Sequence, residues 1–138
     1  MPTKINIENY EQLLTILDGY DNEAYRIFQK LKEADLKDKT RILQYGKHAS
    51  IERIEWDYSD KKDICIRYYD SGYDIYDSAT LWVPIHIFGN DSLIEEWINS
   101  KITEAKELLK QAEEKQQKAK EAHEKAEYER LKAKFENG

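Results

Sequence analysis

The stretch from Ser92 to Phe135 constrains the fold more than any other part of the chain. It contains neither Gly nor Pro, and strong helix formers (Ala, Glu, Lys, Gln and Leu) dominate it. Ser92 followed by Glu95 matches a capping box, in which each side chain satisfies a free backbone donor at the helix N-terminus. A single helix over 93–135 would be roughly 65 Å long, which is longer than a domain of this size is wide. Part of the helix must therefore stand alone or meet another chain.

The 138 residues leave room for one compact domain before this extension. We expect a small α+β domain over 1–100. Residues 101–138 are expected to extend the long helix and to serve in oligomerisation or partner docking.

Short helices are predicted at the start of the domain. Apolar side chains recur at helical spacing over 7–18, and Gly19 is placed to end that helix. A second helix is predicted after Asp21 or Asn22 and a third over about 36–45, and the sequence leaves open whether these two are one bent helix.

The spacing of apolar residues then changes from 3.6 to 2, which predicts a three-stranded antiparallel sheet over Ile51–Tyr58, Ile64–Tyr69 and Tyr73–Phe88. Pro84 cannot donate to a strand ladder, so the third strand is expected to lie at an edge or to be bulged there. Three strands cannot hide an apolar face by themselves. The N-terminal helices and the first turns of the long helix, including Trp97, are the available cover.

The long helix carries a repeat at spacings of four and three that favours a coiled coil. The repeat is apolar at its start and weakens further on, but Tyr128, Leu131 and Phe135 form a second apolar stripe near the end. The alternative is a solvated single helix, supported by Glu–Lys pairs four residues apart. The residues predicted to mediate oligomerisation are Ile98, Ile102, Ala105, Leu109, Ala112, Tyr128, Leu131 and Phe135.

The net charge of −6 is unevenly distributed along the chain. Residues 51–100 carry eleven acidic and four basic side chains, a balance of −7. A protein that neutralises phosphates needs the opposite sign, so direct nucleic-acid binding is not expected.

The lone Cys65 cannot form an internal disulfide, which indicates a reducing compartment. The start of the chain lacks the charged and apolar regions of a signal segment, and no apolar run approaches 18 residues. A cytoplasmic protein without a membrane span is therefore expected.

The sequence offers no constellation that would perform catalysis. The three histidines lack a second ligand at metal-binding spacing, and no glycine-rich phosphate loop occurs. Cys65 lies in the middle of a predicted strand, which favours a structural thiol over a nucleophile. We expect no enzyme activity, no metal and no cofactor.

The acidic and aromatic middle of the chain is the candidate binding site. Tyr, Trp and Arg anchor many interfaces, and exposed aromatic residues ringed by polar groups indicate recognition surfaces. Alternatively, the N-terminal helices cover this face as well, and Trp82 and Tyr69 belong to the core. The predicted partner-binding residues are Asp57, Arg67, Tyr69, Asp70, Tyr73, Asp74, Tyr76, Trp82 and His86.

Two functions fit this surface. The first is a non-catalytic binder or inhibitor, homo-oligomeric through the long helix, that presents the sheet to a protein partner with a basic surface. The second is a small-ligand binder, in which aromatic rings stack on a nucleotide base while Arg53 and Arg67 hold a phosphate. The excess of carboxylates favours the first function.

Three segments carry a resemblance to known proteins: Trp56-Asp57-Tyr58, the run from Val83 to Phe88, and the closing Ala126-Glu127-Tyr128-Glu129-Arg130-Leu131. With its short helical start, the chain resembles small accessory proteins of phages and mobile elements. Many such proteins inhibit host defence systems. The resemblance implies binding of a protein or sequestration of a nucleotide signal.

Overall fold

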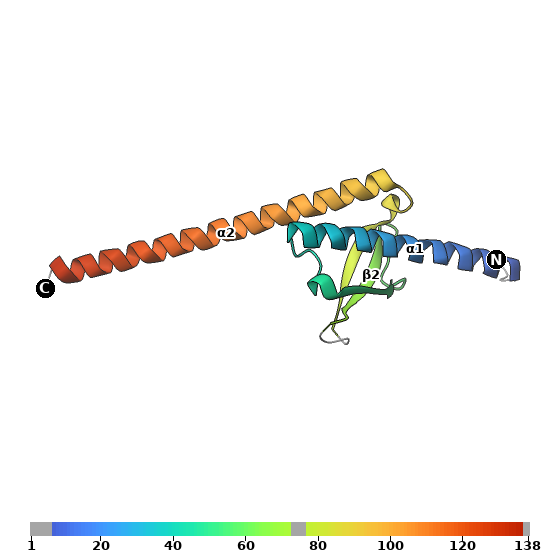
Figure 1. Ribbon diagram of the computed structural model, residues 1–138, viewed down its shortest axis with the longest axis horizontal. Helices are drawn as coiled ribbons and strands as arrows, with labels where there is room; N and C mark the ends of the chain where they lie inside the picture. The colour runs from blue at the N-terminus through green and yellow to red at the C-terminus, as the bar shows by residue number, and fades with distance from the viewer. Residues whose placement is uncertain (1–6, 73–76, 137–138) are drawn as a thin grey trace. The chain divides into compact units, whose positions relative to one another are not determined.

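The computed structural model describes residues 7–72 and 77–136, and it confirms the predicted α+β class (Figure 1). The chain divides into two compact units, Met1–Ile102 and Thr103–Gly138. The elements, in chain order, are helix α1 (Ile7–Asp38), the single turn η1 (Gly46–His48), strands β1 (Ala49–Ile54), β2 (Asp63–Asp70) and β3 (Ser78–Pro84), the single turn η2 (Ile85–Ile87) and helix α2 (Asp91–Glu136).

Helix α1 is one continuous helix of 32 residues, so the prediction of separate short helices was wrong. Gly19 does not end it. A glycine within a helix costs about 1 kcal/mol relative to alanine, and burial of the apolar face further along α1 outweighs that cost. Ile27, Phe28 and Leu31 are all fully buried there.

The predicted third helix over 36–45 was also wrong. Lys39 adopts a left-handed conformation with φ of 55°, and the Thr40 N–H donates to the Asp35 carbonyl at 3.2 Å. This is the hydrogen-bond pattern of a Schellman motif, which ends a helix. Glycine usually holds the left-handed position, so a lysine there gives no stop signal in the sequence.

The sheet is antiparallel with the order β1-β2-β3, so β3 is an edge strand, as Pro84 predicted. Strand β1 ends at Ile54 rather than Tyr58, and Trp56 and Tyr58 lie exposed in the turn that follows. Strand β3 ends at Pro84, because the next three residues form η2.

The inner face of the sheet packs against α1. Ile64, Ile66 and Tyr68 of β2 are buried, and the rings of Phe28 and Tyr68 lie 5.4 Å apart. The first turns of α2 complete this core with Ile94, Ile98 and Ile102, and the half-buried Trp97 packs against it.

Helix α2 begins at Asp91 and is capped by Asn90 instead of Ser92. The Asn90 Oδ1 accepts a hydrogen bond from the Leu93 N–H at 3.1 Å. Ser92 therefore lies two residues after the cap position that the predicted capping box requires and falls inside the first turn.

The second unit, Thr103–Gly138, contains the rest of α2, described to Glu136. Almost all of its described side chains are exposed. Leu109, Tyr128, Leu131 and Phe135 are among them.

Candidate functional site

The candidate site is the outer face of the sheet, opposite the face that packs on α1. The register places Arg53 of β1 directly across from Arg67 of β2. Two adjacent guanidinium groups repel each other unless carboxylates separate them. An irregularity between Ile51 and Arg53 leaves Glu52 without a cross-strand partner, which is the arrangement of a β-bulge. Glu52 and Glu55 supply the carboxylates that are needed.

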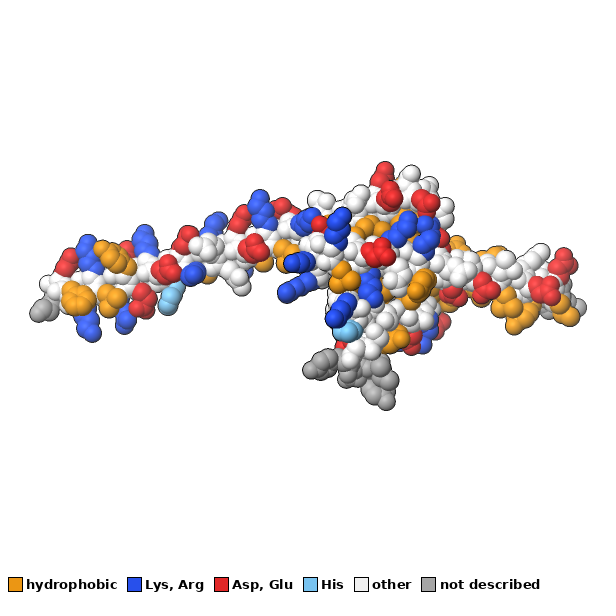
Figure 2. Space-filling model, in the orientation of Figure 1, with side chains coloured by type: hydrophobic (Ala, Val, Ile, Leu, Met, Phe, Trp, Pro, Cys, Tyr) orange, Lys and Arg blue, Asp and Glu red, His pale blue; other side chains and the backbone are white. Residues whose placement is uncertain are grey.

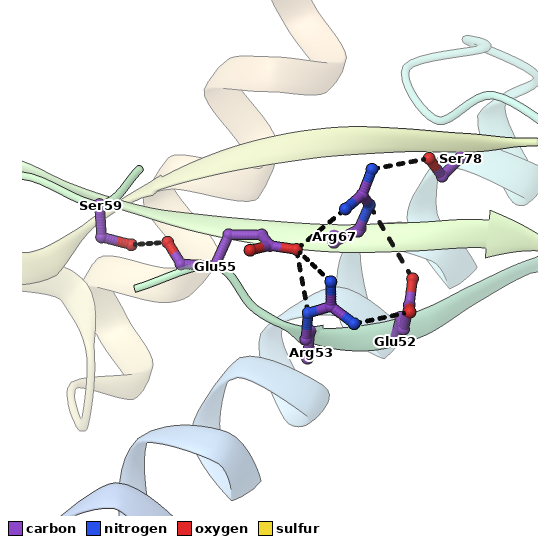
Figure 3. Close-up of polar contacts among 6 residues, drawn as sticks. All are labelled: Glu52, Arg53, Glu55, Ser59, Arg67 and Ser78. Atoms are coloured by element: carbon purple, nitrogen blue, oxygen red, sulfur yellow. Dashed lines mark hydrogen bonds and ion pairs between the residues drawn. The ribbon is translucent and has the colours of Figure 1, made fainter. Parts of the chain in front are cut away.

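These four charged residues form a connected network (Figure 3). The Glu55 Oε1 accepts from the Arg53 Nε at 3.0 Å and from the Arg67 Nη1 at 3.1 Å. The Arg53 Nη1 also donates to the Glu52 Oε1 at 2.9 Å. The Arg67 Nη2 reaches the Ser78 hydroxyl on β3 at 3.3 Å. The network thus links all three strands and is balanced in charge, with two guanidinium groups and two carboxylates.

Trp82 shares this face with Cys65, its cross-strand partner. The Trp82 side chain is 45% exposed, whereas Cys65 is 1% exposed. Burial and, to a smaller degree, the nearby Glu55 raise the pKa of the Cys65 thiol, so the thiol is protonated at neutral pH. The Cys65 N–H donates to the Ser59 hydroxyl at 3.0 Å, which holds the loop after β1 beside the strand.

The other predicted partner-binding residues have different surroundings. Tyr69 is half-buried on the outer face, and Asp57 and His86 are exposed in the turn after β1 and in η2. Asp70 is 8% exposed, and its carboxylate accepts from the Gly72 N–H at 3.0 Å. Its assignment to an exposed binding surface was therefore wrong. Three predicted residues, Tyr73, Asp74 and Tyr76, lie outside the described part of the chain.

The predicted oligomerisation residues divide into two groups. Ile98 and Ile102 are buried in the core of the first unit, so they are not available to a second chain and this part of the prediction was wrong. The other six lie further along α2 and are exposed or half-exposed: Ala105, Leu109, Ala112, Tyr128, Leu131 and Phe135.

One apolar surface was not predicted from the sequence. The sequence predicts that the N-terminal helices cover the sheet, but Tyr10 and Leu13 are exposed on the N-terminal half of α1. A helix of 32 residues spans roughly 48 Å, whereas eight residues of a strand span roughly 26 Å. A single long α1 therefore had to extend beyond the sheet, and helix length was the signal that would have revealed this surface.

Within 7–72 and 77–136, no three His, Cys, Asp or Glu side chains come together as a metal site. None of the helices described has an apolar stretch long enough to cross a membrane.

Comparison of the chain with protein-family models, with curated proteins and with solved structures found no significant match.

Proposed function

We propose that this chain is a non-catalytic interaction protein that binds, and thereby can inhibit, a protein partner through the outer face of its sheet. The observation that carries the proposal is Trp82, a tryptophan that is 45% exposed on an edge strand. Tryptophan is among the residues most enriched at the energetic centres of interfaces. An exposed indole beside a fixed polar network has the composition of a recognition surface.

The network beside Trp82 supports binding of a protein more than binding of a nucleotide. Both guanidinium groups are already engaged by Glu55, with Arg53 and Arg67 bonded to the same carboxylate oxygen. A phosphate would have to displace that carboxylate from its arginines. A protein surface can instead pack on the network as it stands, because the charged groups already satisfy one another.

The surroundings of the network support a partner with a basic surface. Residues 51–100 carry a balance of −7, and Asp57 and Asp77 are exposed near the ends of the strands. The negative electrostatic potential of these side chains accelerates association with a positively charged partner and suppresses binding to phosphates. A cytoplasmic location, expected from the free and buried Cys65, fits this role, as does the resemblance to small inhibitors of host defence.

The exposed apolar residues of the second unit support homo-oligomerisation. Tyr128, Leu131 and Phe135 recur at i, i+3 and i+7 on one helix and are 44–80% exposed. In a second copy the same stripe would supply a matching surface.

The sheet surface can be tested with Trp82→Ala in a capture experiment. Immobilised wild-type protein and the variant are incubated with extract from the source cells, and bound proteins are quantified by mass spectrometry. We expect one protein to be enriched at least tenfold by wild type relative to Trp82→Ala, because truncation of an interface tryptophan commonly costs 2 kcal/mol or more.

Leu36→Ala is the matched control, since Leu36 is exposed to a similar extent, at 43%, near the end of α1. It should capture the same protein as wild type. Circular dichroism of both variants should match wild type. If no protein distinguishes Trp82→Ala from Leu36→Ala, the sheet face is not the binding surface.

A further inference from the structure

The apolar stripe of α1 is covered by the sheet toward its C-terminal end and is exposed, or open, toward its N-terminal end. Its members recur at alternating spacings of three and four residues: Tyr10, Leu13, Leu17, Tyr20, Ala24, Ile27 and Leu31. Ala24, Ile27 and Leu31 are fully buried under the sheet, whereas Tyr10 is 53% and Leu13 is 47% exposed. Figure 2 shows hydrophobic side chains on the N-terminal end of the helix. The stripe thus continues, in the same register, past the edge of the surface that covers it.

A shallow pocket lies where the covered and open halves of the stripe meet. It has a volume of 320 Å³, and its lining includes Ile16, Gly19 and Tyr20 of α1 together with Ile85 and Phe88. The rings of Tyr20 and Phe88 lie 5.5 Å apart. Glu23 and Gly89 complete the lining, so the open stripe ends at a partly apolar hollow that can receive a side chain, as grooves that bind helices do.

The charge around the open stripe has one sign. Residues 7–23 carry five acidic side chains and no basic one. In Figure 2 the same end of α1 shows carboxylates and no lysine or arginine. Two copies packed through this stripe would bring ten carboxylates together, and an anionic membrane would be repelled. A helix with an apolar face and basic flanks is complementary both to the apolar side chains of the stripe and to the acidic side chains around it.

We propose that the open half of the α1 stripe, formed by the exposed Tyr10 and Leu13 with the half-buried Leu17 at its border, docks an amphipathic helix with basic flanks from a partner protein. The docked helix packs on the stripe as the sheet packs on residues 24–31, and its lysines or arginines face the acidic side chains of α1. This surface is separate from the proposed Trp82 surface, since α1 lies on the opposite face of the sheet.

The test uses a synthetic peptide of about 18 residues, with leucines at alternating spacings of three and four and lysines elsewhere. Its binding to the full chain is measured by fluorescence anisotropy. We expect saturable binding, and no binding of a matched peptide in which glutamate replaces lysine.

Leu13→Glu separates docking on the stripe from general attraction between a basic peptide and an acidic protein. The variant is more acidic than wild type, so general attraction would strengthen binding. Docking on the stripe instead predicts binding weakened at least tenfold. Leu108→Glu adds the same charge at an exposed leucine of α2 and should bind at least as tightly as wild type.

A reduction of the negative charge provides a second test. Glu8→Lys/Glu11→Lys changes the balance of residues 7–23 from five acidic side chains to three acidic and two basic ones, and we expect weaker binding of the lysine peptide. Equal binding of the lysine peptide by wild type and Leu13→Glu would overturn the proposal. A dimer of the wild-type chain that Leu13→Glu dissociates would also overturn it, because a second copy would then be the occupant. Binding of the wild type to anionic vesicles, lost in Leu13→Glu, would assign the stripe to a membrane instead.

Discussion

Asp35 fastens the end of α1 to the loop that leads to the sheet. Its side chain is almost fully buried, and it accepts three hydrogen bonds: from the Thr40 hydroxyl at 2.5 Å and from the Ile42 and Leu43 N–H groups at 2.8 and 2.9 Å. Hydrogen bonds to a buried carboxylate are stronger than those between neutral groups. The Asp35 carboxylate thus supplies the acceptors for two backbone N–H groups of a loop that contains several left-handed residues.

Asp35→Ala should lower the free energy of unfolding by about 3 kcal/mol, since it leaves one buried and one partly buried backbone donor without their acceptor. Urea denaturation followed by circular dichroism measures the change. Thr40→Val removes one of the three donors and should cost about 1 kcal/mol, while Thr40→Ser keeps the hydroxyl and should stay near wild type. An Asp35→Ala protein as stable as Thr40→Ser would show that the loop does not depend on this carboxylate.

At the scale of elements, a small ion network joins α1 to the start of α2. Arg26 donates to Glu23 through two nitrogens and contacts Asp91 at 2.6 Å. The Gly89 N–H also donates to Glu23 at 3.2 Å. A hydrogen bond from Arg26 is the main cause of the lowered pKa of Glu23. A separate hydrogen bond from Arg26 to Asp91 is the main cause of the lowered pKa of Asp91.

The lowered pKa of Glu23 makes part of the stability depend on pH. Because the pKa is lower in the folded state, the contribution is complete above the unfolded value of 4.5 and is lost as pH falls through the folded pKa. Glu23→Gln should therefore cost about 1 kcal/mol at pH 7 and much less at pH 2.5. Urea denaturation at both pH values measures this, with the exposed Glu33→Gln as control. A cost that is the same at both pH values would contradict the prediction.

The elements that the sequence predicted well are those whose pattern is local. The alternation of Ile64, Ile66 and Tyr68 identified β2 and its buried face, and Pro84 identified an edge. The predictions that failed depended on tertiary contacts. Gly19 lies in α1 because distant strands bury the same helix, and a lysine ends α1 because Asp35 holds the loop beyond it.

The candidate surfaces were predictable to different degrees. Strand alternation placed Arg67 and Trp82 on one face, and the structure brings both to the outer face of the sheet. Glu52 could not be placed, since a bulge changes which residues face outward. The open half of the α1 stripe was missed because short helices were expected to fit over the sheet.

At the scale of the whole molecule, the stripe near the end of α2 predicts self-association. Leu131 is 44% exposed, and pairing through its stripe would bury it against a second copy. Light scattering on a sizing column should give a dimer or larger for the full chain and a monomer for Leu131→Glu. Ala122→Glu adds the same charge outside the repeat and should keep the wild-type mass. A monomeric wild type would show that this stripe does not join copies of the chain.

The burial of Cys65 allows selective labelling of a cysteine that is introduced elsewhere in the chain. The sequence has one cysteine, and its thiol is both inaccessible and kept protonated, so it reacts slowly with maleimides. A second cysteine introduced on an exposed helix position would be the fast-reacting thiol. A dye or spin label can therefore be attached to α1 or α2 in the otherwise native sequence. The apolar stripe of α1 and the apolar stripe near the end of α2 can then be followed separately.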